Sequence, residues 1–183
     1  HAAVERTRLR AGRSIVVHAA AGGVGLKAVE YAQWLTAGRV LGTAGRPHKH
    51  APLCEAGVDT LCSSHDGAAF VTGAMRLLDA FRADQVLNSL SLDFIAGSLA
   101  ALSEDGALDE IGKRGVWASD RHLAAAPAAS YCAIALDADM ALDPAWMHGV
   151  LALLSARAGG ARSATSLPLQ SFEMEAQHEL AFR

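Results

Sequence analysis

The most informative stretch of the sequence is Ser14-Ile15-Val16-Val17-His18-Ala19-Ala20-Ala21-Gly22-Gly23-Val24-Gly25. It begins with a β-branched apolar run and then changes abruptly to small residues. Beyond that change, apolar residues recur at the spacing of one helical face: Val24, Ala28, Ala32 and Leu35. The pattern predicts a strand, a tight turn and a helix that ends near Thr36, just before a glycine.

The predicted turn matches a pattern of small residues that serves dinucleotide binding. Ala20, Gly22 and Gly25 occupy the three positions of G-x-G-x-x-G, with alanine in the first. Such a turn lets the backbone approach a pyrophosphate, and it aims the N–H groups of the helix at that group. The sequence therefore predicts a dinucleotide site, and the alternative is a tight strand-to-helix turn without a ligand.

Length and composition indicate a globular α/β protein of one domain or slightly more. The chain has 183 residues, of which 51% are hydrophobic, and its net charge is −3. We expect no nucleic-acid partner, because nothing in this charge balance provides a basic surface. We also expect no membrane segment, because no apolar run approaches the roughly 20 residues of a span. Without a signal peptide, the expected location is the cytoplasm.

The cysteines and histidines do not have the spacing of metal ligands. Cys54, Cys62 and Cys132 are scattered, and each is expected to be a buried apolar residue. The eight histidines form no H-E-x-x-H motif, and His48 and His50 are too close for a helical pair. We therefore predict no metal site and no structural zinc.

Strands and helices alternate along most of the sequence, which predicts a Rossmann-like, doubly wound parallel sheet with helices on both faces. The expected strands are 15–18, 39–44, 58–62, 85–88, 107–112 and 131–136. The expected helices between them are 24–36, 49–55, 68–81, 94–102 and 146–157, with others at 1–9 and after Ser171. In helix 68–81 the expected core residues are Phe70, Met75, Leu77, Leu78 and Phe81.

The end of the second strand indicates which nicotinamide cofactor fits. A fold that prefers NAD usually places an acid here for the ribose 2′-hydroxyl. No acid occurs between Arg39 and Ala51, and the loop instead carries Arg46 and Lys49. A 2′-phosphate would meet two cations and no repelling carboxylate, so the loop predicts NADPH. The alternative is a solvated basic loop.

Three further motifs point to a family when they are taken together. Val17–Gly25, Val86–Leu90 and Glu110–Lys113 resemble the enoyl reductase domain of modular and iterative polyketide synthases. That domain belongs to the zinc-free branch of the medium-chain dehydrogenase/reductase superfamily, near the quinone oxidoreductases. The motifs occur in the family's order and spacing, and the resemblance covers nearly the whole chain.

The resemblance implies a reaction and its partners. Such domains transfer hydride from NADPH to the β-carbon of an α,β-unsaturated thioester, and protonation of the α-carbon follows. The thioester is held by an acyl carrier protein within the larger synthase. The implied cofactor residues are Ala21, Gly22, Gly23, Val24 and Gly25 at the pyrophosphate, Arg46 and Lys49 at the 2′-phosphate, and Asn88, Ser89 and Leu90 beside the nicotinamide.

Two residues match catalytic positions of the family. Lys113 corresponds to a lysine proposed to donate a proton or to act on the carbonyl side. Asp137 resembles the acid that follows this lysine, although the spacing here is slightly longer and Asp139 lies close by. Each also has a simpler interpretation: Lys113 as a solvated lysine, Asp137 as a turn or capping residue. Asn88 could likewise only satisfy backbone groups of a turn.

The resemblance covers only the nucleotide-binding half of such a domain. Residues 1–160 are expected to form the dinucleotide-binding subdomain, and residues 161–183 to return toward a substrate-binding subdomain that this sequence does not contain. We therefore expect little reductase activity from the chain alone. The alternatives are a stand-alone quinone oxidoreductase-like enzyme and a degenerate structural module that binds no cofactor.

Asp109 and Trp117 are among the residues that depart from the family pattern. Asp109 lies inside the fifth strand, where a buried unpaired carboxylate would be costly, so we expect it to be paired or at an edge. Trp117 suggests a bulky group near the substrate, or packing alone.

Overall fold

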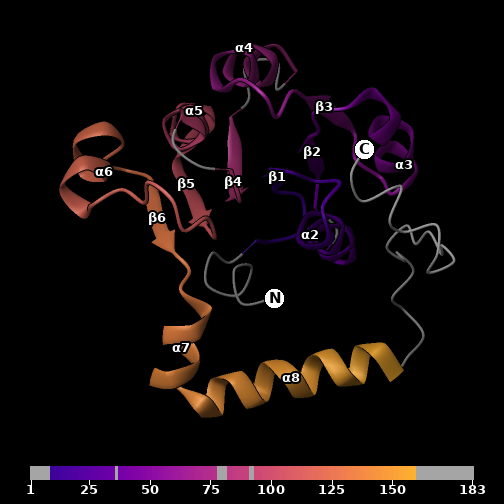
Figure 1. Ribbon diagram of the computed structural model, residues 1–183, viewed down its shortest axis with the longest axis vertical. Helices are drawn as coiled ribbons and strands as arrows, with labels where there is room; N and C mark the ends of the chain where they lie inside the picture. The colour runs from indigo at the N-terminus through magenta and orange to yellow at the C-terminus, as the bar shows by residue number, and fades with distance from the viewer. Residues whose placement is uncertain (1–8, 36, 78–81, 91–92, 160–183) are drawn as a thin grey trace, which may run out of the picture.

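The computed structural model describes residues 9–35, 37–77, 82–90 and 93–159, and these form a six-stranded parallel sheet (Figure 1). Its order is β3-β2-β1-β4-β5-β6, and every pair is parallel. The strands are β1 (Ser14–Val17), β2 (Arg39–Thr43), β3 (Thr60–Cys62), β4 (Ala83–Asn88), β5 (Leu102–Glu110) and β6 (Ser130–Ala133). The order reverses between β1 and β4, which creates the crevice where such sheets bind ligands.

Helices cover both faces of the sheet, which confirms the doubly wound fold. The described helices are α2 (Gly23–Trp34), α3 (His50–Glu55, after the 3-10 turn η1 at Pro47–Lys49), α4 (Gly67–Leu77), α5 (Asp93–Ala101), α6 (Ser119–Ala125), α7 (Leu136–Leu142) and α8 (Pro144–Gly159). Figure 1 shows α2 on one side of the strands and α4 with α5 on the other.

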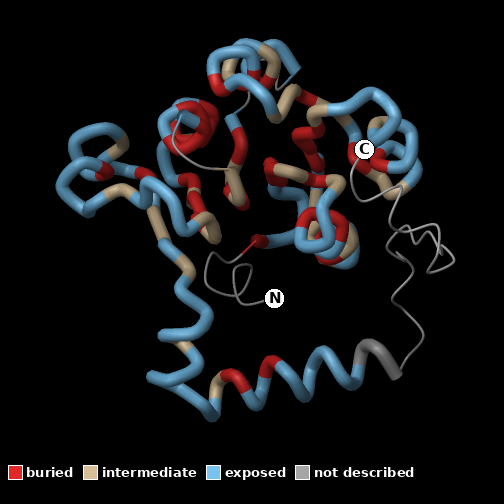
Figure 2. Tube along the Cα trace, in the orientation of Figure 1, coloured by how far each residue is buried: buried red, intermediate tan, exposed pale blue. Residues whose placement is uncertain are grey.

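Two apolar cores follow from the alternation of side chains along the strands. Val16 of β1 faces α4 and α5 and packs in a cluster with Phe70 and Ile95. Its neighbours Ile15 and Val17 point the other way, into a cluster with residues of α2 and α3. Figure 2 shows that the central strands are buried, whereas most of α7 and α8 is exposed.

The core prediction for α4 was right in part. Phe70 is fully buried, but Met75 is 55% exposed and Leu77 is 37% exposed, so those two predictions were wrong. Phe70 and Ala74 form the face that packs inward. Met75 lies well around the helix from that face, and Leu77 is the last described residue of α4. Leu78 and Phe81 lie outside the described residues.

Other element boundaries differ from the predicted ones, and the pairing of the strands explains the differences. The predicted strand 131–136 ends at Ala133, because its partner β5 ends at Glu110, the residue paired with Ala133. The chain then turns into α7, which the sequence analysis did not expect. Strand β5 also starts earlier than predicted, at Leu102, and the register with β4 shifts so that the exposed residues Glu104 and Asp105 remain outside the ladder. Helix α6 was not predicted.

Single side chains also departed from expectation. Val24, predicted on the buried face of α2, is 62% exposed because it lies in the first turn, beyond the edge of the sheet. Cys54 is exposed on α3, whose buried residue is Leu53, whereas Cys62 is buried as predicted. Burial raises the pKa of the Cys62 thiol to about 11. No helix among the described residues is long and apolar enough to cross a membrane.

Candidate functional site

The turn after β1 presents backbone N–H groups at the carboxyl end of the sheet. Ala19 has a positive φ of 48°, and the Gly22 N–H donates to the Ala19 carbonyl at 2.8 Å. Gly22 then caps α2 with extended backbone, no side chain accepts from the first N–H groups, and no acid lies in the first turn. Gly22, Gly23 and Val24 are exposed. A helix start without a competing carboxylate is suited to an anion.

Gly25 holds this helix close to the strand. A Cβ atom at Gly25 would lie 2.6 Å from the Ala20 Cα and nearer still to the Ala19 carbonyl oxygen. Real Cβ atoms do not make such contacts with backbone, so only glycine fits without a shift. This is the close helix–strand packing for which the third small residue of the motif is required.

The basic loop after β2 lies beside the glycine turn. The Ala20 N–H donates to the carbonyl of Thr43, the last residue of β2, at 3.0 Å. Arg46 and Lys49 follow at η1, and both are exposed. No ion pair to either cation occurs within the part of the chain that the structure describes. The His65 imidazole contacts the Gly45 carbonyl at 2.8 Å, so a residue that the sequence analysis passed over helps to fix the loop.

A buried histidine joins the glycine turn to its surroundings. Nε2 of His18 lies 2.8 Å from the Ser98 hydroxyl, and Nδ1 lies 3.3 Å from the Thr43 hydroxyl. That Thr43 oxygen also accepts from the Ala19 N–H at 3.0 Å. Burial lowers the pKa of His18 to about 3, so the imidazole is neutral near pH 7. His18 thus acts as a neutral polar support beneath the turn.

Asn88, Ser89 and Leu90 follow β4 on the other side of the crevice. The Asn88 side chain is fully buried, and its Oδ1 accepts from the Leu90 N–H at 3.0 Å. The Ser89 hydroxyl donates to the His18 carbonyl at 3.2 Å. Asn88 therefore does satisfy a backbone group of the turn, as the simpler interpretation stated. The same bonds hold this segment beside the end of β1.

Lys113 and Asp137 come together although they lie in different elements. The Lys113 Nζ is 3.7 Å from the Asp137 Oδ2, and the two side chains are 79% and 74% exposed. Backbone N–H groups at the start of α7, and then the Lys113 charge, hold the pKa of Asp137 below its usual range. The structure brings the predicted pair together, while Asp139, on the same helix, is not the residue that pairs with Lys113.

Comparison with known proteins extends this geometry to a family. No family model matches the sequence. A phenolphthiocerol/phthiocerol polyketide synthase polypeptide of Mycobacterium tuberculosis is 35% identical over 147 residues, which are 79% of this chain and 7% of that protein. The crystal structure of CurK enoyl reductase is similar with a TM-score of 0.81 and 30% identity, over 91% of this chain and 49% of the other.

A solved fragment matches the extent of this chain. It is the nucleotide-binding subdomain of the enoylreductase domain of PpsC from Mycobacterium tuberculosis, with a TM-score of 0.76 and 29% identity, covering 87% of this chain and 90% of the fragment. The chain is a homologue of the nucleotide-binding half of polyketide synthase enoyl reductases. It spans only a small part of the polyketide synthase polypeptides and about half of a full enoyl reductase domain.

Glu110 was not predicted from the sequence as a site residue of this enoyl reductase half. Glu110 lies at the end of β5, directly opposite Asn88, and is 1% exposed. Its carboxylate accepts from the Asn88 amide and from the Gly112 N–H, both at 2.5 Å. The residues around Glu110 in the sequence do not indicate that its carboxylate is buried. The available signal was its place in the Glu110–Lys113 motif.

The departures from the family pattern at Asp109 and Trp117 have structural explanations. Asp109 is buried, but its Oδ2 accepts from the Gln85 amide at 2.8 Å, which confirms that it is paired. Trp117 packs against the α4–α5 core cluster, and the Arg121 guanidinium lies 4.1 Å from its ring centre. These contacts support the packing interpretation of Trp117.

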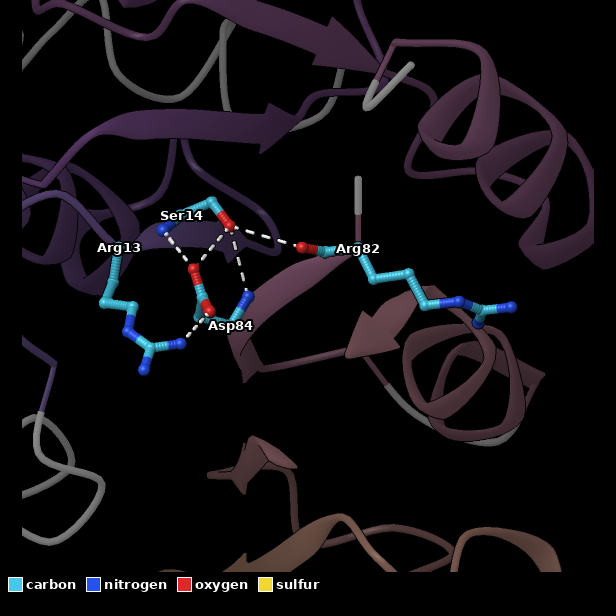
Figure 3. Close-up of polar contacts among 4 residues, drawn as sticks. All are labelled: Arg13, Ser14, Arg82 and Asp84. Atoms are coloured by element: carbon cyan, nitrogen blue, oxygen red, sulfur yellow. Dashed lines mark hydrogen bonds and ion pairs between the residues drawn. The ribbon is translucent and has the colours of Figure 1, made fainter. Parts of the chain in front are cut away.

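The opposite edge of the sheet is formed by the amino-terminal ends of the strands. A cavity of about 110 Å³ lies there, lined by Leu9, Arg10, Arg13, Asp84, Gln85, Asp105 and Ala107. Asp84 accepts from the Ser14 N–H at 2.7 Å and from its hydroxyl at 3.0 Å, and it pairs with Arg13 (Figure 3). None of the predicted site residues lines this cavity. Among the described residues, no group of three or more His, Cys, Asp or Glu side chains is placed to hold a metal ion.

Proposed function

We propose that the chain is the NADPH-binding part of a polyketide synthase enoyl reductase, which reduces the α,β double bond of an enoyl thioester on an acyl carrier protein. The observation that carries the proposal is the exposed start of α2, which no side chain caps, at the point where the strand order reverses. Three further groups lie at the same edge: the basic loop follows β2, the Asn88–Leu90 segment lies at the end of β4, and Lys113 follows β5.

The residues present fit a dinucleotide of this kind. The Gly22–Gly25 turn would hold the pyrophosphate by its N–H groups, which no side chain caps. Arg46 and Lys49 would bind the 2′-phosphate, and no acid competes in that loop. Asn88, Ser89 and Leu90 would line the nicotinamide side. When bound, the cofactor supplies the hydride, and the protein supplies position and charge.

Lys113 would act on the substrate side of the same edge. Its ammonium group is exposed and lies within ion-pair distance of Asp137, so it can hold a proton where a thioester enolate would develop. Asp137 would orient this lysine rather than touch the substrate. An exposed ion pair of this type adds little to stability, so its value would lie in positioning.

The proposed activity requires partners. A substrate-binding subdomain would supply the acyl pocket, and the acyl carrier protein and other polyketide synthase domains would deliver the substrate in the cytoplasm. Without that subdomain, the thioester would lack the support that a near-attack geometry requires. We therefore expect cofactor binding without efficient reduction.

The test is a titration of this chain with NADPH and with NADH, followed by nicotinamide fluorescence. We expect NADPH to bind more tightly, and Lys49→Ala to weaken NADPH about tenfold, which is about 1.4 kcal/mol, with little effect on NADH. Arg76→Ala is the matched control, because it removes an exposed cation from the far end of α4. Failure of the folded chain to bind either cofactor would favour the alternative of a structural module.

A further inference from the structure

We propose that Glu110 is a positioning residue that locks together the two segments of the site, Asn88–Leu90 after β4 and Gly112–Lys113 after β5. The inference rests on the proposed function, because it assigns these segments to the nicotinamide and substrate side. It gives a role to a residue that neither the motif nor the similarity to known enzymes explains.

Glu110 touches both segments with one carboxylate. Its Oε2 accepts from the Asn88 Nδ2, and its Oε1 accepts from the Gly112 N–H, each at 2.5 Å. A carboxyl group has two oxygens, and each can accept a hydrogen bond. Each oxygen of a single buried group therefore holds one of the two strand ends.

The bond to Asn88 also fixes the direction of its amide. Because the Asn88 NH₂ group faces Glu110, its Oδ1 is left to accept from the Leu90 N–H at 3.0 Å. A reversal of the amide would place oxygen against the carboxylate and NH₂ against the Leu90 N–H. Glu110 thus determines the backbone position of Leu90 through Asn88, without contacting Leu90 itself.

The bond to the second segment depends on a glycine. A Cβ atom at Gly112 would lie 2.5 Å from the Glu110 Oε1, so the carboxylate occupies the space that any side chain would need. This close approach sets where the chain leaves β5, one residue before Lys113. The glycine of the Glu110–Lys113 motif is therefore explained by the carboxylate two residues earlier.

A neighbouring pair provides the comparison. Asp109, the preceding residue on β5, is also fully buried and also accepts from an amide of β4, that of Gln85. Gln85 lies three residues before the end of β4 and outside the candidate site. Two adjacent buried carboxylates thus both accept from amides of β4, but Glu110 accepts from the residue that ends that strand.

The experiment measures the binding of two ligands to three variants. NADPH spans the whole proposed site, whereas 2′,5′-ADP carries the 2′-phosphate without the nicotinamide. We expect Glu110→Gln to weaken NADPH about tenfold and to leave 2′,5′-ADP within about twofold. Gly112→Ala, which keeps the carboxylate and displaces it, should have the same selective effect. Asp109→Asn should change neither ligand.

A readout without ligand separates this inference from the proposed function. In amide NMR spectra of the free chain, Glu110→Gln should shift the Leu90, Gly112 and Lys113 signals, and Asp109→Asn should not. The proposal is overturned if these signals stay in place, if both ligands weaken equally, or if both Glu110→Gln and Gly112→Ala fail to fold. Failure of the wild-type chain to bind NADPH, with the shifts as expected, would count against the proposed function alone.

Discussion

The two edges of the sheet each hold a carboxylate near a strand end, but Glu110 is buried and Asp84 is partly exposed, and their partners differ. At the amino-terminal edge, Asp84 joins β4 to the start of β1 and pairs with Arg13, while Ser14 donates to it twice (Figure 3). At the carboxyl-terminal edge, Glu110 joins β5 to the end of β4 through an amide and a backbone N–H. One carboxylate has a cation beside it, and the other has neutral donors.

The difference has opposite consequences for the two acids. Burial raises the pKa of Asp84, but hydrogen bonds from Ser14 and Arg13 outweigh it and leave the pKa below its usual value. Burial also raises the pKa of Glu110, and its two hydrogen bonds leave it at about 7. Asp84 therefore stabilises the fold when ionised, whereas ionised Glu110 opposes it. An unfavourable charge at the carboxyl-terminal edge supports the site proposed there.

The largest expected effect is on the pH dependence of stability. The folded-state pKa of Glu110 is raised from 4.5 to about 7, so the protonated form favours folding. That stabilisation is complete below pH 4.5 and is lost as the pH rises to about 7, a change of about 3 kcal/mol. We expect this decline in the wild-type chain relative to Glu110→Gln, measured by urea unfolding across that range.

The difference in unfolding free energy between the wild-type chain and Glu110→Gln excludes the other titrating groups, because both proteins contain them. His18 has a lowered pKa, so it destabilises the fold as the pH falls below 6.5, but it is present in both. Tyr131, which faces Glu110 from β6, has a raised pKa and stays neutral across the range. Asp137 has a lowered pKa and stays ionised. If the difference in unfolding free energy between the two proteins stayed constant from pH 4.5 to 7, the pKa of Glu110 would not be raised in the folded protein.

The second effect concerns the glycine turn of the carboxyl-terminal edge. Gly25→Ala would force its Cβ against the backbone of Ala19 and Ala20, which should lower the free energy of unfolding by about 1–3 kcal/mol and abolish NADPH binding. Gly149→Ala is the matched control, since nothing lies within 4 Å of its Cβ position in α8. Thermal unfolding and fluorescence titration measure both properties. An unchanged NADPH affinity in Gly25→Ala would place the cofactor elsewhere.

The third effect concerns the amino-terminal edge. Asp84→Ala removes the acceptor of the Ser14 N–H and should lower the free energy of unfolding by about 1–3 kcal/mol. The NADPH affinity should not change, because this edge lies at the other end of the strands. Asp84→Asn, which keeps an acceptor oxygen, should recover part of the stability. A loss of NADPH affinity in a folded Asp84→Ala protein would contradict the division between the edges.

The smallest effect is expected at Arg13, the exposed ion-pair partner of Asp84 at the amino-terminal edge. Arg13 is 58% exposed, so Arg13→Ala should lower the free energy of unfolding only slightly, and by less than Gly25→Ala or Asp84→Ala. High salt should reduce the difference further. Urea unfolding at low and high salt measures it, and a larger, salt-independent loss would mean that Arg13 contributes mainly by packing.

The sequence predicted the fold well where local patterns and burial agree. Six strands alternate with helices in the predicted order, and the glycine turn has the predicted form because its small residues are required by sterics within a few positions. The end of β6 could not be predicted, since it is determined by Glu110 on another strand. Met75 was misassigned because an apolar side chain does not reveal which face of a helix meets its neighbour.

For the site, the sequence predicted strand ends better than side-chain partners. The Lys113–Asp137 contact was anticipated through the family resemblance, not through spacing. His18 directly follows β1 and Glu110 ends β5, and both were missed as supports because a buried polar residue is recognised only by the partners that satisfy it. Those partners, Ser98 and Asn88, are 80 and 22 residues distant in the chain.

The most direct test of the central claim is an amide NMR titration of the chain with NADPH. The account predicts shifts for Gly22, Gly23 and Gly25 and for the Leu90 and Gly112 amides, with the Ser14 and Asp84 amides unmoved. Shifts confined to the amino-terminal edge around Arg10 and Arg13, or no shifts at all in the folded chain, would contradict it.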